Sequence, residues 1–116
     1  MNGLYKYRAE LVRVVDGDTY DFDVDLGFYT TKRIRVRMIG VDTHETYGVS
    51  HDSEEYALGK REAEFVKEWF AEQDEIIIET DEDEKGKYGR WLALVHGDSK
   101  CLNDVLISEF GVTSNE

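Results

Sequence analysis

Two strictly alternating segments separated by a short turn constrain the fold more than any other feature. In YDFDVDL (20–26) aspartates alternate with apolar residues, and in KRIRVRMI (32–39) basic residues do so from Arg33 onward. A side-chain period of two is that of a β-strand with one buried and one solvent-facing side. The two segments therefore predict a long hairpin. Its inward side chains are expected to be Tyr20, Phe22, Val24, Leu26, Ile34, Val36 and Met38.

The remaining segments predict one domain of the α+β class, mainly β, over residues 1–116. A helix is expected from a capping box at Asp52 and Glu55 to about Glu72. The other elements are strands at 7–15, 75–80 and 88–97 and a final helix at 102–110 that ends at Gly111. Five strands with a helix between the third and fourth and a C-terminal helix is the layout of the five-stranded OB-fold barrel.

The charge of the chain is divided unevenly. The net charge is −12, but residues 1–45 hold 7 basic and 8 acidic residues, whereas residues 46–116 hold 7 and 18. The excess of acidic residues argues against a protein that coats nucleic acid through its overall positive charge. The basic cluster KRIRVR (32–37) lies in the first part, so a local anion site remains compatible with this composition.

Other sequence features bear on localisation, disulfides and oligomeric state. No run of 18 apolar residues is present, so no membrane span is expected. The N-terminal residues lack the apolar core of a signal peptide, which predicts a cytoplasmic protein. The single cysteine, Cys101, excludes an internal disulfide and is expected to be buried. The oligomeric state stays open between a monomer and a weak dimer.

Oxygen ligands cluster where two predicted strands end. Asp18 follows the first strand, and Asp42, Thr43 and Glu45 follow the third. Carboxylate and main-chain carbonyl oxygens are the ligands that hard cations such as Ca²⁺ prefer. If the strands pair, these groups can converge on one divalent cation. The alternative is that Asp16, Asp18 and Asp42 only cap turns.

Three arginines share one side of the predicted third strand. Arginine grips phosphate with a planar fork of donors and stays charged. Arg33 and Arg35 are expected to pair across the hairpin with Asp21, Asp23 or Asp25. Arg37, together with Arg90 in the distant KYGR segment (87–90), is left as the candidate phosphate ligand.

The histidines and tryptophans are not assigned to the candidate site. His44, His51 and His96 have no metal-ligand spacing, although His44 lies inside the acidic cluster. Trp69 and Trp91 fall on periodic apolar positions and are expected in the core.

Taken together, the segments VVDGDT, RMIGVDTHE and KYGR, in this order around a helix, resemble the staphylococcal nuclease (thermonuclease) family. The resemblance covers roughly residues 7–111. It implies that Asp18 and Asp42 bind Ca²⁺ through carboxylates, with the Thr43 carbonyl as a further ligand. It also implies roles for the other candidates: Glu45 as general base, Arg37 and Arg90 on the scissile phosphate, and Lys87 and Tyr88 on the nucleotide.

The implied activity is hydrolysis of DNA and RNA at the 5′ P–O bond, leaving 3′-phosphates. Two departures from the family stand out. His44 replaces the usual proline, and the sequence is shortened at the C-terminus, where the family continues into a third helix. Two alternatives remain: a catalytically weak OB-fold module that binds nucleic acid, and a protein-interaction barrel.

Overall fold

The described residues form five strands and two helices in the predicted order. The computed structural model describes residues 5–44, 46, 48–81 and 90–113. The strands are β1 (Tyr5–Asp16), β2 (Thr19–Asp25), β3 (Thr31–Met38), β4 (Ile76–Asp81) and β5 (Arg90–His96), and the helices are α1 (Glu54–Ala71) and α2 (Leu102–Phe110). The alternation in the sequence therefore located the hairpin strands to within one residue at each end.

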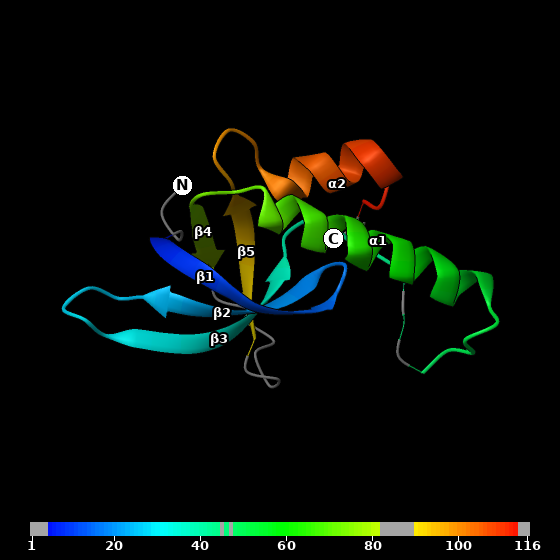
Figure 1. Cartoon of the computed structure of the whole chain (residues 1–116), viewed down its shortest axis with the longest axis horizontal. Coiled ribbons are helices and arrows are strands. Elements are labelled where there is room, and N and C mark those ends of the chain that lie inside the picture. Colours follow the sequence, from blue (N-terminus) through cyan, green and yellow to red (C-terminus); the bar gives the residue numbers. More distant parts are fainter. Residues whose placement is uncertain (1–4, 45, 47, 82–89, 114–116) are drawn as a thin grey trace.

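The strands close into a barrel in the order β1-β2-β3-β5-β4. Neighbours are antiparallel except for β3 and β5, which run parallel and bring the two halves of the chain together. Figure 1 shows the β2–β3 hairpin projecting away from the two helices. A closed five-stranded barrel with a helix after its third strand is an OB-fold, which confirms the predicted fold class.

The inward side of the hairpin forms much of the core. Tyr20, Phe22, Val24, Val36 and Met38 are buried, as the alternation predicts. The core also contains Phe70 of α1, whose ring meets those of Tyr20 and Phe22 edge-on at centroid distances of 5.3 and 5.9 Å. Helix α1 thereby packs against the barrel interior.

Two core predictions are wrong, and Ile34 is only partly buried. Leu26 is 42% exposed and Trp91 is 38% exposed. Leu26 has the inward-facing parity of its neighbours but follows the last residue of β2. Trp91 is the second residue of β5, next to the start of that strand. Periodicity identifies the side of a strand but does not show where the barrel ends along it.

The tip of the β2–β3 hairpin is an unusual turn. The Thr30 amide donates to the Gly27 carbonyl at 2.9 Å, and the two central residues, Phe28 and Tyr29, have φ values of 57° and 61°. Positive φ at both central positions is typical of a type I′ turn, which favours Asn-Gly. Both aromatic side chains are fully exposed. Burial therefore does not offset the cost of this backbone conformation.

The helix ends correct one prediction and confirm another. Helix α1 is capped by Ser53, whose Oγ accepts the Tyr56 amide at 3.1 Å, so the predicted capping residue Asp52 is wrong by one position. Gly111 ends α2 with a φ of 67° and donates to the Ile107 carbonyl, as expected of a C-terminal glycine. Within the described ranges, neither helix has the length and apolar character needed to cross a membrane.

Helix α2 and the segment after it fix the end of β3. The buried Asn103 donates from Nδ2 to the Ile39 carbonyl at 2.8 Å and accepts the Val95 amide at 2.9 Å. Beyond the helix, the Val112 carbonyl accepts the Asp42 amide at 2.9 Å. The residues that follow β3 are thus held by contacts far along the chain.

Candidate active site

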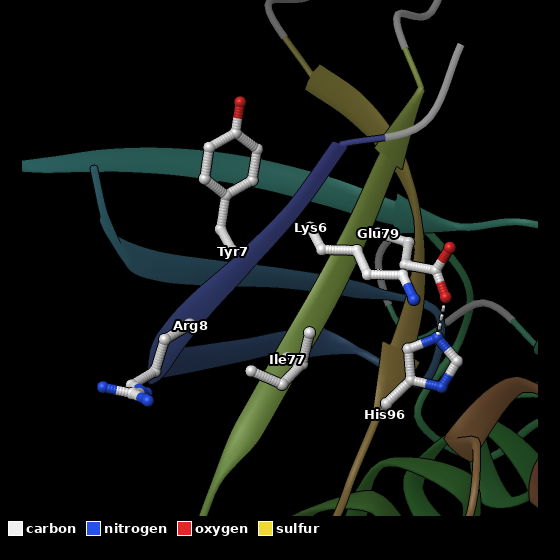
Figure 2. Close-up of a pocket in the computed structure, with 6 residues that line it drawn as sticks. All are labelled: Lys6, Tyr7, Arg8, Ile77, Glu79 and His96. Carbon is white, nitrogen blue, oxygen red and sulfur yellow. Dashed lines mark hydrogen bonds and ion pairs between the residues drawn. The ribbon is translucent and has the colours of Figure 1, made fainter. Parts of the chain in front are cut away.

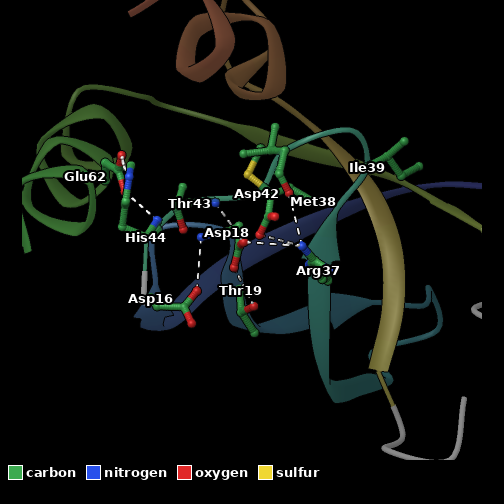
Figure 3. Close-up of polar contacts among 12 residues, drawn as sticks. Asp16, Asp18, Thr19, Arg37, Met38, Ile39, Asp42, Thr43, His44 and Glu62 are labelled. Atoms are coloured by element: carbon green, nitrogen blue, oxygen red, sulfur yellow. Dashed lines mark hydrogen bonds and ion pairs between the residues drawn. The ribbon is translucent and has the colours of Figure 1, made fainter. Parts of the chain in front are cut away.

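Asp18 lies in the turn between β1 and β2, where its side chain is buried. Its Oδ1 accepts the Thr19 hydroxyl at 3.0 Å, and its Oδ2 accepts the Thr43 amide at 3.1 Å (Figure 3). Asp16 acts locally, because its Oδ1 accepts the Asp18 amide at 3.1 Å. The turn-capping alternative therefore describes Asp16, whereas Asp18 joins two distant segments.

Arg37 connects the two predicted metal ligands. Its Nη2 lies 3.2 Å from Asp42 Oδ1 and 3.6 Å from Asp18 Oδ2, and it also donates to the Val41 carbonyl at 3.4 Å (Figure 3). The β2–β3 register pairs Arg37 with Thr19, next to Asp18. The predicted phosphate ligand and the two predicted cation ligands thus form one cluster.

The cluster is open on one side. The Asp42 side chain is 61% exposed, whereas that of Asp18 is 9% exposed and that of Arg37 is 22% exposed. An anion or cation can therefore approach over Asp42 while Asp18 stays fixed beneath it.

Thr43 fits against the β1–β2 turn without room to spare. A Cβ built on Gly17 would lie 2.8 Å from Thr43 Oγ1, so only glycine permits this approach. The Tyr20 hydroxyl donates to the Gly17 carbonyl at 2.6 Å from inside the barrel. Thr43 Oγ1 is buried and lacks a hydrogen-bond partner among the described residues. Such an oxygen is costly to leave without a partner.

His44 is bound to a glutamate that the sequence analysis did not identify. Glu62 of α1 accepts the His44 amide on Oε1 at 2.8 Å, and its Oε2 lies 2.9 Å from His44 Nδ1. The hydrogen bond to Glu62 raises the pKa of His44 above its usual value. A signal was present in the sequence. Glu62 is four residues before Val66, so it occupies the apolar side of a helix that otherwise buries Val66, Trp69 and Phe70.

Arg33 and Arg35 have the structural role expected of them. Arg33 Nε lies 2.9 Å from Asp23 Oδ1, and Arg35 Nε lies 2.8 Å from Asp21 Oδ1. These hydrogen bonds lower the pKa of both aspartates. The two cross-strand predictions are confirmed.

Part of the predicted site is not described. Glu45, Lys87 and Tyr88 lie outside the described residues. For Arg90 only the backbone is described: it is the first residue of β5 and pairs with Arg35 of the parallel strand β3. The strand pairing therefore brings Arg90 next to the strand that carries Arg37.

The donor set fits a hard cation in its chemistry. Asp18 and Asp42 have carboxylate oxygens close to one guanidinium nitrogen, and Thr43 has a main-chain oxygen as well as a hydroxyl without a partner among the described residues. Among the described residues, no group of three or more His, Cys, Asp or Glu side chains is arranged to hold a metal. The predicted set contains only two such side chains besides Glu45, so a cation here depends on carbonyl and water ligands as well.

A separate pocket lies on the outer surface of β1, β4 and β5 (Figure 2). It is lined by Lys6, Tyr7, Arg8, Ile77, Glu79 and His96. The Glu79 carboxylate bonds to His96 Nε2, and Arg8 pairs with Glu75 at 3.0 Å. Glu79 and Arg8 are thus paired, and Lys6 is a further basic residue of the lining.

The fold and the cluster together define an OB barrel with two aspartates and an arginine where β1 and β3 end and β2 begins. A family model described as staphylococcal nuclease homologue matches residues 35–113, and the chain belongs to this family. The resemblance seen in the sequence motifs is thus confirmed.

The chain is similar to several curated proteins. It is 37% identical over 100 residues to the Thermonuclease of Staphylococcus hyicus, a match that covers 86% of this chain and 54% of that protein. It is 38% identical over 97 residues to the Thermonuclease of Staphylococcus intermedius, covering 84% and 53%. It is 33% identical over 93 residues to Endonuclease YhcR of Bacillus subtilis, covering 78% and 7%. The chain spans about half the length of the two thermonucleases.

Proposed function

We propose that this chain is a Ca²⁺-dependent phosphodiesterase that hydrolyses DNA and RNA, cleaving the 5′ P–O bond and leaving 3′-phosphates. The observation that carries the proposal is the convergence of Asp18, Asp42 and Arg37 at one open surface site. It is supported by similarity to proteins named Thermonuclease and Endonuclease.

The arginines have the chemistry to stabilise the reacting phosphate. Hydrolysis of a phosphodiester adds negative charge to the oxygens around phosphorus, and guanidinium donors placed there lower the barrier. One Arg37 nitrogen is engaged by the aspartates, but a guanidinium has five N–H donors. Arg37 can therefore hold phosphate while it keeps its carboxylate partners, and we assign Arg90 the same role.

The acidic residues divide into ligands and a base. Asp18, Asp42 and the Thr43 carbonyl would hold Ca²⁺, which when bound supplies Lewis-acid stabilisation of the phosphate oxygens. Glu45 takes a proton from the attacking water as general base. Lys87 and Tyr88 complete the proposal as contacts to the nucleotide.

A cleavage assay tests this function. Single-stranded DNA and RNA are incubated with the protein in Ca²⁺ or in chelator, and the product ends are identified. We expect Ca²⁺-dependent fragments ending in 3′-phosphate. Unchanged cleavage in chelator would contradict the metal dependence. Binding without cleavage at any Ca²⁺ concentration would favour the weak binding module instead.

The general base has its own test. Glu45→Gln removes the proton acceptor but keeps the side-chain size, and we expect turnover to fall by about 10²-fold or more, the scale of general-base catalysis. Near-normal turnover would rule out Glu45 as the base.

A further inference from the structure

Glu62 is a buried carboxylate for which the proposed chemistry has no use. The residue is 2% exposed, and α1 points its side chain at the loop that follows Val41 (Figure 3). A buried carboxylate is costly unless its oxygens are hydrogen-bonded. Both oxygens of Glu62 bond to His44, one to the main-chain amide and one to the ring. A carboxylate of α1 that is costly to bury is thus used to bind one residue, His44, of the loop that follows β3.

The bond to the main chain has a geometric consequence. The His44 N–H and the Thr43 carbonyl belong to the same peptide group, which is planar and trans, so the two point in opposite directions. By holding the His44 N–H, Glu62 fixes the direction of the Thr43 carbonyl. The preceding amide, that of Thr43, is held by Asp18. Two consecutive amides are therefore anchored by carboxylates from different parts of the fold.

We propose that Glu62 is a positioning residue that orients the Thr43 carbonyl toward the cation and steadies the loop leading to Glu45. This inference rests on the proposed function, because it concerns a carbonyl assigned there as a metal ligand. Glu62 itself bonds to His44 rather than to the Asp18, Arg37 and Asp42 side chains. Its action on the site passes through the peptide group between Thr43 and His44.

Two substitutions separate positioning from general stability. Glu62→Gln retains an oxygen for the His44 amide and an N–H for a neutral His44 ring. Glu62→Leu fills similar space but accepts no hydrogen bond. Glu64→Leu is the matched control, because Glu64 lies on the same helix with its side chain 59% exposed.

The first measurement is Ca²⁺ affinity by calorimetry, with no substrate present. Loss of a group that orients a metal ligand lowers metal affinity by about 10–100-fold. We expect a loss of this size in Glu62→Leu, near-native affinity in Glu62→Gln and no change in Glu64→Leu. Native affinity in a folded Glu62→Leu variant would overturn the proposal.

The second measurement is hydrogen exchange at the His44 amide in Ca²⁺-free protein. We expect faster exchange at this amide in Glu62→Leu, with protection kept in Glu62→Gln. Because this readout needs no cation and no cleavage, it tests Glu62 even if the wild type proves unable to bind Ca²⁺ or cut nucleic acid. Unchanged exchange in Glu62→Leu would show that Glu62 does not hold the loop.

Discussion

Arg37 and Asp42, five positions apart and on either side of a glycine turn, form an ion pair of 3.2 Å at the end of β3. The turn at Gly40 has a φ of 76°, which lets the chain double back so that residue 42 meets residue 37. The proposed anion ligand and a proposed cation ligand are therefore each other's partners in the protein alone.

Replacing Arg37 is expected to lower catalytic turnover more than replacing either of the other arginines on β3, Arg33 and Arg35. Arg37→Ala removes the proposed transition-state donor, so turnover should fall by about 10²-fold or more. Arg33→Ala is the matched control, since Arg33 has an exposed side chain that pairs with Asp23. Steady-state cleavage of an oligonucleotide measures both variants. Equal losses in the two would mean that β3 contributes general charge rather than a specific contact.

Gly17→Ala is expected to displace Thr43, because Gly17 in the β1–β2 turn lies directly against the Thr43 side chain. The added methyl group would lie under 3 Å from the Thr43 side chain, so Thr43 must move away from the β1–β2 turn. Overpacking of this kind costs about 1–3 kcal/mol and here also displaces a proposed ligand. We expect a lower melting temperature together with weaker Ca²⁺ binding. If calorimetry finds native Ca²⁺ affinity in this variant, Thr43 is not a ligand of the cation.

The hairpin tip offers a stability prediction that is independent of function. Phe28→Asn with Tyr29→Gly places the preferred type I′ pair at the two positive-φ positions. Each bulky residue held at positive φ costs on the order of 1 kcal/mol, and neither side chain is buried. The double variant should therefore be more stable in chemical denaturation. Lower stability would indicate that the aromatic pair makes contacts that offset the strain.

The pair of His44 and Glu62 gives a prediction for pH. Hydrogen bonding to Glu62 raises the pKa of His44 in the folded protein. Its contribution to stability is therefore fully present below the unfolded-state pKa of about 6.5 and is lost as pH rises through the higher folded-state pKa. NMR titration should show the His44 pKa falling toward its usual value in Glu62→Gln but not in Glu64→Gln. An identical His44 pKa in all three proteins would contradict this cause.

The sequence predicted the parts of the fold that depend on periodicity. Tyr20, Phe22 and Val36 could be assigned to the core because the alternation of a strand fixes which side each residue faces. The start of α1 was misplaced because Asp52 and Ser53 are both good capping residues, and the choice depends on backbone angles that composition does not specify. Leu26 and Trp91 were misassigned because exposure depends on where the barrel ends.

In the candidate site, too, the contacts that follow from strand pairing were predictable, whereas a contact that depends on tertiary packing was not. Convergence of Asp18 with Asp42 followed from strand pairing, which local patterns could suggest. The bond from Glu62 to His44 joins a helix to a loop 18 residues earlier, and no repeat in the sequence encodes that distance. A charged residue on the apolar side of α1 signals a buried partner, but the identity of that partner requires the packed structure.

The amide of Asp42 is bound by the carbonyl of Val112, which follows α2. A ribosome makes residue 42 long before residue 112, so the nascent chain carries the motif of the site well before the contact that secures it exists. Completion of the site is thereby tied to synthesis of the chain through Val112, and a chain interrupted before Val112 would lack this hydrogen bond to Asp42.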